Sequence, residues 1–352
     1  MVVQKAGKHE PASTTHDPAI DGVLVVDKPS GLTSHDVVAI ARRALHEKRI
    51  GHTGTLDPLA TGILPLACGR ATRLVRFLIA SDKDYDAVIR FGAVTDTYDV
   101  TGAEKQRSDR RPSRHALEEA LASLCGEQLQ TPPPYSAKKV AGTRAYELAR
   151  GNVAVELAPV PVRVTRAALL RFDGEDAAIA ITCSAGFYVR SFAHELGQRL
   201  GTGACLAALR RTRSGQFVLD DAVTIEELQG EVRLKADPTK TIAADIAQAI
   251  ATDPATAIAA DPLKTLEANP ARTVAARLLP LASLLPSLPA ATVTGEGRER
   301  VGHGRELDAV HCDDRPALDA EWVRLLDREG QLIALAQPGT RPGSLHPAVV
   351  LI

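Results

Sequence analysis

The segment HTGTLDPLATG, residues 52–62, holds a single carboxylate, Asp57, among glycines and threonines. An Asp before a proline in such a segment usually forms an Asx turn that only shapes the loop. A carboxylate held rigidly in a loop can instead act as a nucleophile or a base, and glycine lets a ligand approach the backbone closely. His52 could donate a hydrogen bond nearby or simply cap the loop. From this segment alone, both interpretations stay open.

The sequence carries no signature of a bound cofactor. It lacks a phosphate-binding loop, a G-x-G-x-x-G segment and a metal-ligand cluster. Its five cysteines are scattered without a C-x-x-C pair, which argues against a disulfide framework and a structural zinc site. We therefore expect no metal and no cofactor, and we interpret the cysteines as buried free thiols.

Composition and charge are those of an ordinary globular protein. The chain has 352 residues, 45% of them hydrophobic, which is enough for two domains. No apolar run is long enough to span a bilayer, and the polar N-terminus lacks a signal-peptide core, so we expect a cytoplasmic protein without a membrane partner. The net charge of −1 hides basic clusters on both sides of the Asp57 segment. They consist of Arg42, Arg43, Lys48 and Arg49 before it and of Arg70, Arg73 and Arg76 after it.

Hydrophobic patterning predicts an α+β protein with a mixed β-sheet and flanking helices. GVLVV (22–26) is typical of a buried strand, and Ser34 is a candidate N-cap for the helix that follows. A second helix is expected over ATRLVRFLIASDK, a third with Ser113 as its N-cap, and a fourth over FYVRSFAHELGQRLG. Extended segments are expected on both sides of Gly92 and over residues 161–185.

The chain divides into four segments by composition. Residues 1–20 are expected to form a flexible tail, and residues 21–228 to form the main domain. Residues 229–280 are rich in alanine and are interpreted as a low-complexity insertion or linker. Residues 281–352 alternate apolar and polar residues, which predicts a small β-rich domain with Trp322 as its core anchor.

Five motifs, in order along the chain, resemble those of the TruB family of tRNA pseudouridine synthases. GHTGTLDPLATGILPLACGRATR is similar to the catalytic motif of this family, and GVLVVDKPSGLTSHD resembles its N-terminal lysine–proline motif. SDKDYDAVIRFGAVTDTYDVTG, CSAGFYVRSFAHELG and GACLAALRRTRSG resemble the second, third and closing motifs. The resemblance extends from about residue 21 to residue 223.

The resemblance implies a pseudouridine synthase core and a reaction. One uridine in the T-arm of tRNA, at position fifty-five, would be isomerised to pseudouridine without a cofactor. The C1′–N1 bond breaks, the base rotates while it is held, and a C1′–C5 bond forms. Asp57 would be the essential carboxylate, acting either as a nucleophile or by removing a proton from the sugar.

The same resemblance assigns roles to residues outside the loop. Arg190 would pair with Asp57 and keep it anionic, although a solvated arginine on a helix face is the alternative. Tyr85 would stack on the flipped base and is a candidate proton acceptor in the last step, although it could be a plain core tyrosine. Tyr188 and Leu209 would line the uracil pocket.

Two further residues and one segment would contact or support the RNA. His52 would lie against the RNA near the flipped nucleotide. Lys28 would either touch RNA or brace the loop below Asp57. The basic, proline-rich segment 131–152 corresponds to a segment that clamps the T-loop in this family, and its candidate phosphate contacts are Lys138, Lys139 and Arg144.

The C-terminal segment occupies the place of a small RNA-binding β-barrel of the PUA type in bacterial relatives. Here the domain is acidic and has only Arg298, Arg300 and Arg305 clustered near its start. The resemblance further implies a monomer that needs no protein partner and binds tRNA. A guide-RNA-dependent synthase of the dyskerin type and a non-catalytic tRNA-folding chaperone are the alternatives.

Overall fold

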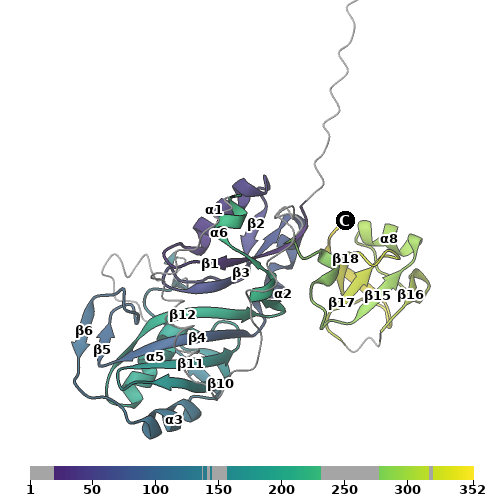
Figure 1. The fold of residues 1–352 in the computed structure, drawn as a ribbon. Coiled ribbons are helices and arrows are strands. Elements are labelled where there is room, and N and C mark those ends of the chain that lie inside the picture. The colour runs from purple at the N-terminus through teal and green to yellow at the C-terminus, as the bar shows by residue number, and fades with distance from the viewer. Residues whose placement is uncertain (1–19, 137, 141–142, 145–156, 231–276, 317–319) are drawn as a thin grey trace, which may run out of the picture.

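The structure is a computed structural model that describes residues 20–136, 138–140, 143–144, 157–230, 277–316 and 320–352. The expected tail, most of the alanine-rich insertion and most of the segment 137–156 lie outside the described residues. Figure 1 shows a large sheet with helices beside it and a smaller β-rich domain at the C-terminal end.

The large sheet has ten strands and is mixed, because β1 pairs in parallel with β14 and β3 with β12, while the other pairs are antiparallel. This confirms the expected α+β class. The strand order is β14 (Ala222–Val223), β1 (Gly22–Lys28), β3 (Thr61–Cys68), β12 (Ala204–Ser214), β4 (Lys83–Phe91), β11 (Asp176–Cys183), β10 (Val160–Phe172) and β7 (Gly126–Gln130), with β2 (Ile50–His52) beside β3 and β13 (Phe217–Val218) beside β12.

Helices and two short hairpins complete the large domain. The helices are α1 (Ser34–Ala44), α2 (Val75–Ile79), α3 (Arg114–Ser123), α5 (Val189–Arg199) and α6 (Ile225–Leu228), and a 3₁₀ turn over Gly69–Leu74 precedes α2. The hairpins are formed by β5 (Ala93–Thr95) with β6 (Glu104–Arg107) and by β8 (Lys139–Val140) with β9 (Thr143–Arg144). The helix expected over residues 71–83 is therefore shorter, since β4 already begins at Lys83.

The start of α1 differs from the expectation. Thr33, not Ser34, is the N-cap, because the Thr33 hydroxyl accepts from the Asp36 amide while the Asp36 carboxylate accepts from the Thr33 amide. This reciprocal arrangement is a capping box. The Ser34 side chain is thereby free for another task, and it points toward the Asp57 loop. Ser113 is the N-cap of α3, as expected.

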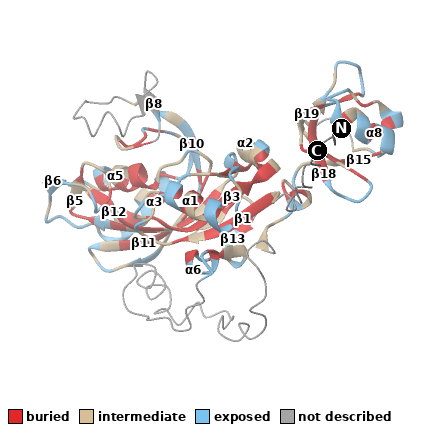
Figure 2. Cartoon of the chain, turned by 90° about the horizontal axis from the view of Figure 1, so that it is seen from above, coloured by how far each residue is buried: buried red, intermediate tan, exposed pale blue. Residues whose placement is uncertain are grey.

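Two apolar clusters lie on opposite faces of the large sheet. One packs beneath α1, α3 and α5 and includes Leu24, Ile89 and Phe192. The other, on the opposite face of β1 and β3, includes Val25 and Ile63 and continues into the C-terminal domain. Figure 2 shows buried residues concentrated along the strands.

The C-terminal domain is a five-stranded sheet with helix α8 (Gly295–Gly302). The strand order is β16 (Cys312–Asp314), β15 (Ala290–Val293), β17 (Val323–Leu326), β18 (Leu332–Pro338) and β19 (Leu345–Val350). The expected β-rich domain is confirmed, but the role expected for Trp322 is wrong. Its ring packs edge-on against Phe77 of α2, with centroids 4.7 Å apart, so it joins the two domains rather than filling the small core.

The second basic cluster of the sequence serves the same junction. Arg70 donates to the Leu351 carbonyl at 2.6 Å and pairs with Asp21, and Arg73 donates to the Val350 carbonyl. The guanidinium of Arg76 lies over the Phe77 and Trp322 rings. Arg70 and Arg73 therefore hold the C-terminal end of the chain and Arg76 contacts Trp322, which a count of charges along the chain does not show.

Two features of the sequence can be compared with the structure directly. Of the five cysteines, Cys68, Cys183 and Cys205 are buried, Cys312 is half-buried, and Cys125 is exposed, contrary to the expectation for that residue. Within the described parts of the chain, no helix is both long and apolar enough to cross a membrane.

Candidate active site

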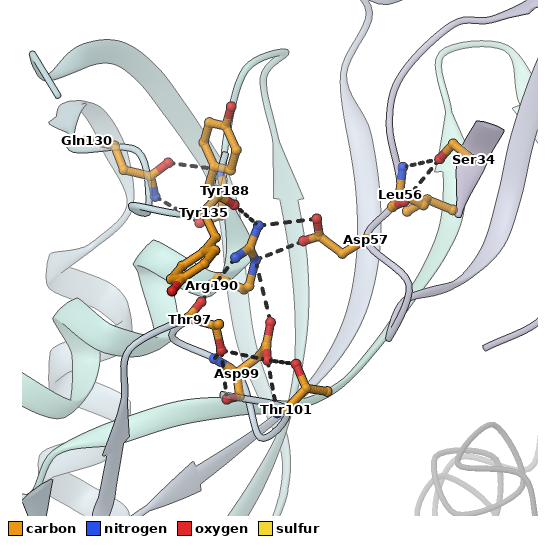
Figure 3. Close-up of polar contacts among 10 residues, drawn as sticks. All are labelled: Ser34, Leu56, Asp57, Thr97, Asp99, Thr101, Gln130, Tyr135, Tyr188 and Arg190. Atoms are coloured by element: carbon orange, nitrogen blue, oxygen red, sulfur yellow. Dashed lines mark hydrogen bonds and ion pairs between the residues drawn. The ribbon is translucent and has the colours of Figure 1, made fainter. Parts of the chain in front are cut away.

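Asp57 lies in the loop that connects β2 to β3, and the loop is held from below by side chains of the neighbouring segment. Ser34 at the start of α1 donates to the Leu56 carbonyl at 3.0 Å and accepts from the Leu56 amide at 2.8 Å (Figure 3). The backbone amide and carbonyl of Leu56, the residue before Asp57, are thereby fixed. The Gly31 amide donates to the Pro58 carbonyl at 2.8 Å, which fixes the residue after it.

Lys28, at the end of β1, lies fully buried beneath the same loop. Its ammonium donates to the carbonyls of Pro29 and Leu32, each at 2.8 Å, and to that of Pro58 at 3.4 Å. Burial lowers the pKa of Lys28 to about 8, although the Asp57 charge opposes this shift. Of the two roles expected for Lys28, this geometry corresponds to the brace, and any contact with RNA stays a prediction.

The carboxylate of Asp57 is bound by the guanidinium of Arg190 through two parallel hydrogen bonds. Nε donates to Oδ2 at 2.8 Å and Nη2 donates to Oδ1 at 3.1 Å (Figure 3). The Asp57 side chain is 37% exposed, whereas that of Arg190 is 6% exposed. A fork of this kind fixes both the direction and the charge of a carboxylate. The pairing is the one expected from the sequence.

Arg190 is itself fixed by three further groups. Nη1 donates to the Thr97 carbonyl at 3.0 Å, and Nη2 donates to the Tyr135 carbonyl at 2.9 Å. The buried carboxylate of Asp99 lies 3.8 Å from Nε. Asp99 accepts in turn from the side chain of Thr97 and from the amide and hydroxyl of Thr101. Arg190 therefore has a fixed position before any substrate arrives.

Tyr85 and Leu209 occupy the inner face of the sheet next to this loop. Tyr85 lies on β4 and Leu209 on β12, and their residual exposures are 9% and 7%. Burial raises the pKa of the Tyr85 phenol, while the nearby Arg211 cation lowers it. Both side chains belong to the apolar cluster under the helices, so their roles toward uracil stay predictions.

Tyr188 lies two residues before Arg190, and His52 lies five residues before Asp57. Tyr188 is the N-cap residue of α5, and the Gln130 side chain bonds both its amide and its carbonyl, at 2.8 and 3.1 Å. Burial raises the pKa of the Tyr188 phenol and lowers that of the His52 imidazole. Nδ1 of His52 is buried and has no hydrogen-bond partner among the described residues. Its expected contact with RNA stays a prediction.

The arrangement can present one fixed, solvent-reachable carboxylate to a ligand. Across the ranges that the structure describes, no three His, Cys, Asp or Glu side chains gather into a group able to hold a metal ion. The Asp57 carboxylate can offer nucleophilic attack or proton transfer, with the Arg190 guanidinium holding its oxygens in place.

Two family descriptions match the chain over its core. Residues 42–189 match the TruB family pseudouridylate synthase N-terminal domain, and residues 190–251 match the tRNA pseudouridylate synthase B C-terminal domain. A tRNA pseudouridine synthase B from Solibacter usitatus is 40% identical over 333 residues, which is 94% of this chain and 100% of that protein. This chain belongs to the TruB family.

A second relative agrees with the TruB assignment, and two solved structures share the fold. A tRNA pseudouridine synthase B from Symbiobacterium thermophilum is 42% identical over 81% of this chain and 82% of its own. A chain from an H/ACA RNP bound to a substrate RNA containing 2′-deoxyuridine superimposes with a TM-score of 0.64. It is 22% identical and covers 95% of this chain and 86% of its own. A Cbf5-Nop10-Gar1 complex gives the same TM-score at 23% identity and 95% and 86% coverage, so these two share the fold.

The TruB motifs predicted the pairing of Asp57 with Arg190 but missed part of the support of this pair. Asp99 lies in DTYDVTG, and its spacing from Thr97 and Thr101 is a signal for an Asx-type loop. Arg211 is 1% exposed and bonds the Asp57 loop, yet in the run RRTR it looks like its neighbours. Arg210 and Arg213 instead form half-exposed pairs with carboxylates. Only the register of β12 in the sheet determines which of these arginines is buried.

The proposed clamp of this TruB protein is described only in part. Lys138 is exposed, and β8 and β9 pair Lys139 with Arg144 across a short hairpin. Residues 137, 141–142 and 145–152 of this segment and the side chains of Lys139 and Arg144 lie outside the described residues. Their contacts with tRNA therefore stay predictions.

Proposed function

We propose that this protein isomerises the uridine at position fifty-five in the T-arm of tRNA to pseudouridine, with Asp57 as the essential carboxylate. The observation that carries the proposal is the two-pronged binding of Asp57 by the buried Arg190, in a chain that belongs to the TruB family. A carboxylate fixed in this way is ready to meet the electron-deficient C1′ as the bond to N1 breaks.

The reaction needs the uracil to leave its stack, because the reacting atoms of a base inside a folded stem-loop cannot otherwise be reached. The C1′–N1 bond breaks, uracil turns, the C1′–C5 bond forms, and the proton lost from C5 is balanced by one gained at N1. Tyr85, Tyr188 and Leu209 are proposed to hold the base, and His52 the neighbouring nucleotide. Support comes from their positions around the Asp57 loop on β2, β4, β12 and at the start of α5.

The decisive experiment incubates the protein alone with a transcribed tRNA and maps pseudouridine along the product. We expect one pseudouridine, at position fifty-five, and none in a transcript with cytidine there. Product that forms only after a guide RNA is added would favour the dyskerin-type alternative. Accelerated tRNA folding by both the wild type and Asp57→Asn, with no product from either, would favour the chaperone alternative.

Lys138, Lys139 and Arg144 are proposed to bind phosphates of the T-arm. Replacing all three with glutamine should weaken tRNA binding and reduce the slope of log affinity against log salt by roughly two to three units, if each touches a phosphate. A control variant replaces Lys105 and Arg107, which are exposed on the β5–β6 hairpin. An equal loss of tRNA affinity in both variants would show that the effect comes from the net charge of the protein alone. We also propose that the protein is a monomer and is located in the cytoplasm.

A further inference from the structure

Arg211 is an arginine that the proposed mechanism does not use. It lies on β12, is 1% exposed, and is the largest of the fully buried side chains among the described residues. Nε donates to the Ile63 carbonyl at 2.7 Å and Nη2 to the Gly54 carbonyl at 3.1 Å. Gly54 precedes Asp57 and Ile63 follows it. One guanidinium therefore holds the chain on both sides of the catalytic loop.

The contact is close because β3 and β12 approach each other at a glycine. Gly62 has a φ of +96°, and a side chain there would meet the Arg211 carbonyl oxygen at 2.2 Å. Only glycine combines this backbone conformation with that approach. The parallel register places Gly62 opposite Arg211, so the loop that ends at β3 returns directly onto the buried arginine.

The same arginine stands next to Tyr85. The two residues are direct partners in the antiparallel β12–β4 ladder, so their side chains leave the same face of the sheet as neighbours. The Arg211 charge lowers the pKa of the phenol, against the larger opposite effect of burial. The other groups that act on the phenol are Cys183 of β11 and Asp57 of the loop.

The charge of Arg211 is not neutralised by a carboxylate within ion-pair distance in the described chain. Its charge also lowers the pKa of Lys28 and of Lys83, and burial, the larger cause, brings both to about 8. Lys28 and Lys83 donate only to backbone carbonyls in the described structure. A buried, unpaired cation costs several kcal/mol in typical proteins. A fold that keeps such a group beside its active site gains something other than stability from it.

We propose that Arg211 is a positioning residue for the isomerisation, one that ties the Asp57 loop to the Tyr85 strand and keeps a positive charge against the base-binding side of the site. The proposal rests on the proposed function. Uracil leaves C1′ with its electron pair, so negative charge develops on the base next to Tyr85. A fixed cation below that position favours the charge-separated state without reorganising during the step.

Two substitutions separate geometry from charge. Arg211→Lys keeps the charge but cannot bind both carbonyls in the fork geometry, whereas Arg211→Met removes both. We expect kcat to fall by on the order of 10²-fold in the lysine variant and further in the methionine variant. KM for tRNA should change by less than about threefold in both, because a buried residue makes no phosphate contact.

The matched control is Arg213→Met. Arg213 lies two positions further along the same strand, on the opposite face, where it pairs with Asp84 at 2.7 Å. This variant should keep the kcat and KM of the wild type. Wild-type-like kcat in Arg211→Lys and Arg211→Met, with only a lower melting temperature, would overturn the proposal and leave Arg211 a purely structural residue.

A second readout does not depend on turnover. Carbon-13 labelling of the tyrosine ring reports the ionisation of Tyr85, assigned by its loss in Tyr85→Phe. We expect the Tyr85 titration to move to higher pH in Arg211→Met and to stay near the wild-type position in Arg211→Lys. An unchanged titration in the methionine variant would also overturn the proposal. If the wild type makes no pseudouridine, the proposed function fails while this titration can still show the charge coupling.

Misfolding of the arginine variants would not remove the test. In the wild-type protein, the Nε resonance of Arg211 should respond at the pH where Tyr85 ionises, and Tyr85→Phe should abolish that response while Tyr98→Phe keeps it. A resonance that is insensitive to Tyr85 ionisation would contradict the proposed contact.

Discussion

Asp57 comes from the half of the large sheet built on β1, β2 and β3, whereas Tyr85 and Arg190 come from β4 and from α5 on the other half. The first half fixes the backbone of the loop, because Ser34 bonds the amide and the carbonyl of Leu56 and the Lys28 ammonium donates to the Pro58 carbonyl. The second half fixes the carboxylate through a charged fork. The site lies where β3 meets β12 in a short parallel pairing of two residues on each strand.

The difference teaches that position and charge are controlled separately. The loop backbone can be correct while the carboxylate is free to turn, and the fork can be intact while the loop shifts. Arg190 and Arg211 both cross between the halves, one to a carboxylate and one to carbonyls. Variants on either side should therefore fail in different ways.

The largest effect is expected from removing the charge of Asp57, which one half of the site positions and the other half binds. Asp57→Asn should abolish isomerisation and leave tRNA binding within about tenfold, since binding depends mostly on phosphate and shape contacts. Single-turnover assays and filter binding measure the two quantities. Turnover of more than a few per cent of wild type would exclude Asp57 as the catalytic carboxylate.

The second variant removes the fork but keeps the loop. Arg190→Met should lower turnover by on the order of 10²-fold by freeing the carboxylate. It should also lower the free energy of unfolding by about 3–5 kcal/mol, because Asp99 would be left as a buried carboxylate without its cation. Denaturant unfolding and kinetics measure both.

Arg199→Met is the control for that variant. Arg199 lies on the same helix and forms an exposed pair with Glu195, which is typically worth less than about 1 kcal/mol. Comparable losses in the two variants would mean that α5 is disturbed in general, and the special role of Arg190 would be lost.

The third prediction concerns Lys28, which braces the backbone of the Asp57 loop, and the pH dependence of the stability that it contributes. Lys28 has a pKa of about 8 when folded and near 10.5 when unfolded. Between these values the unfolded chain binds more protons, so stability due to Lys28 rises with pH through this window. The unfolding free energy of wild type relative to Lys28→Met should therefore increase from pH 8 to pH 10.5, by up to about 3 kcal/mol.

Lys105→Met is the matched control, because Lys105 is 61% exposed. Its difference from wild type should stay flat over the same pH range. A flat difference for Lys28→Met as well would show that the folded and unfolded chains hold this proton equally, and that Lys28 is not a buried cation under the loop.

The smallest effect on chemistry is expected at the domain junction. Trp322→Ala should destabilise the contact with α2 by about 1–3 kcal/mol through loss of the ring contact with Phe77. Turnover at saturating tRNA should change by less than about threefold, since both halves of the site stay intact. Trp322→Phe, which keeps an aromatic ring, is the control. A large loss of turnover would make the C-terminal domain part of the catalytic unit.

The sequence by itself predicted most of the elements and singled out the Asp57 loop as a candidate site. The alternation of β4, the helical face of α1 and the Ser113 cap follow from local periodicity and capping, which depend on neighbours in the chain. The pairing of Asp57 with Arg190 was predicted only because five motifs together resemble one family. No local pattern connects residues 133 positions apart.

Tertiary structure alone decided which charged residues are buried beside the site and which form ion pairs at the surface. Arg210, Arg211 and Arg213 look alike in the sequence, but the register and bulges of β12 bury one and expose the others. Likewise, packing of the C-terminal domain turned Trp322 from an expected core residue into a junction residue. Burial and partnership of a charge depend on surfaces brought together by folding, and these set its pKa, its cost and its function.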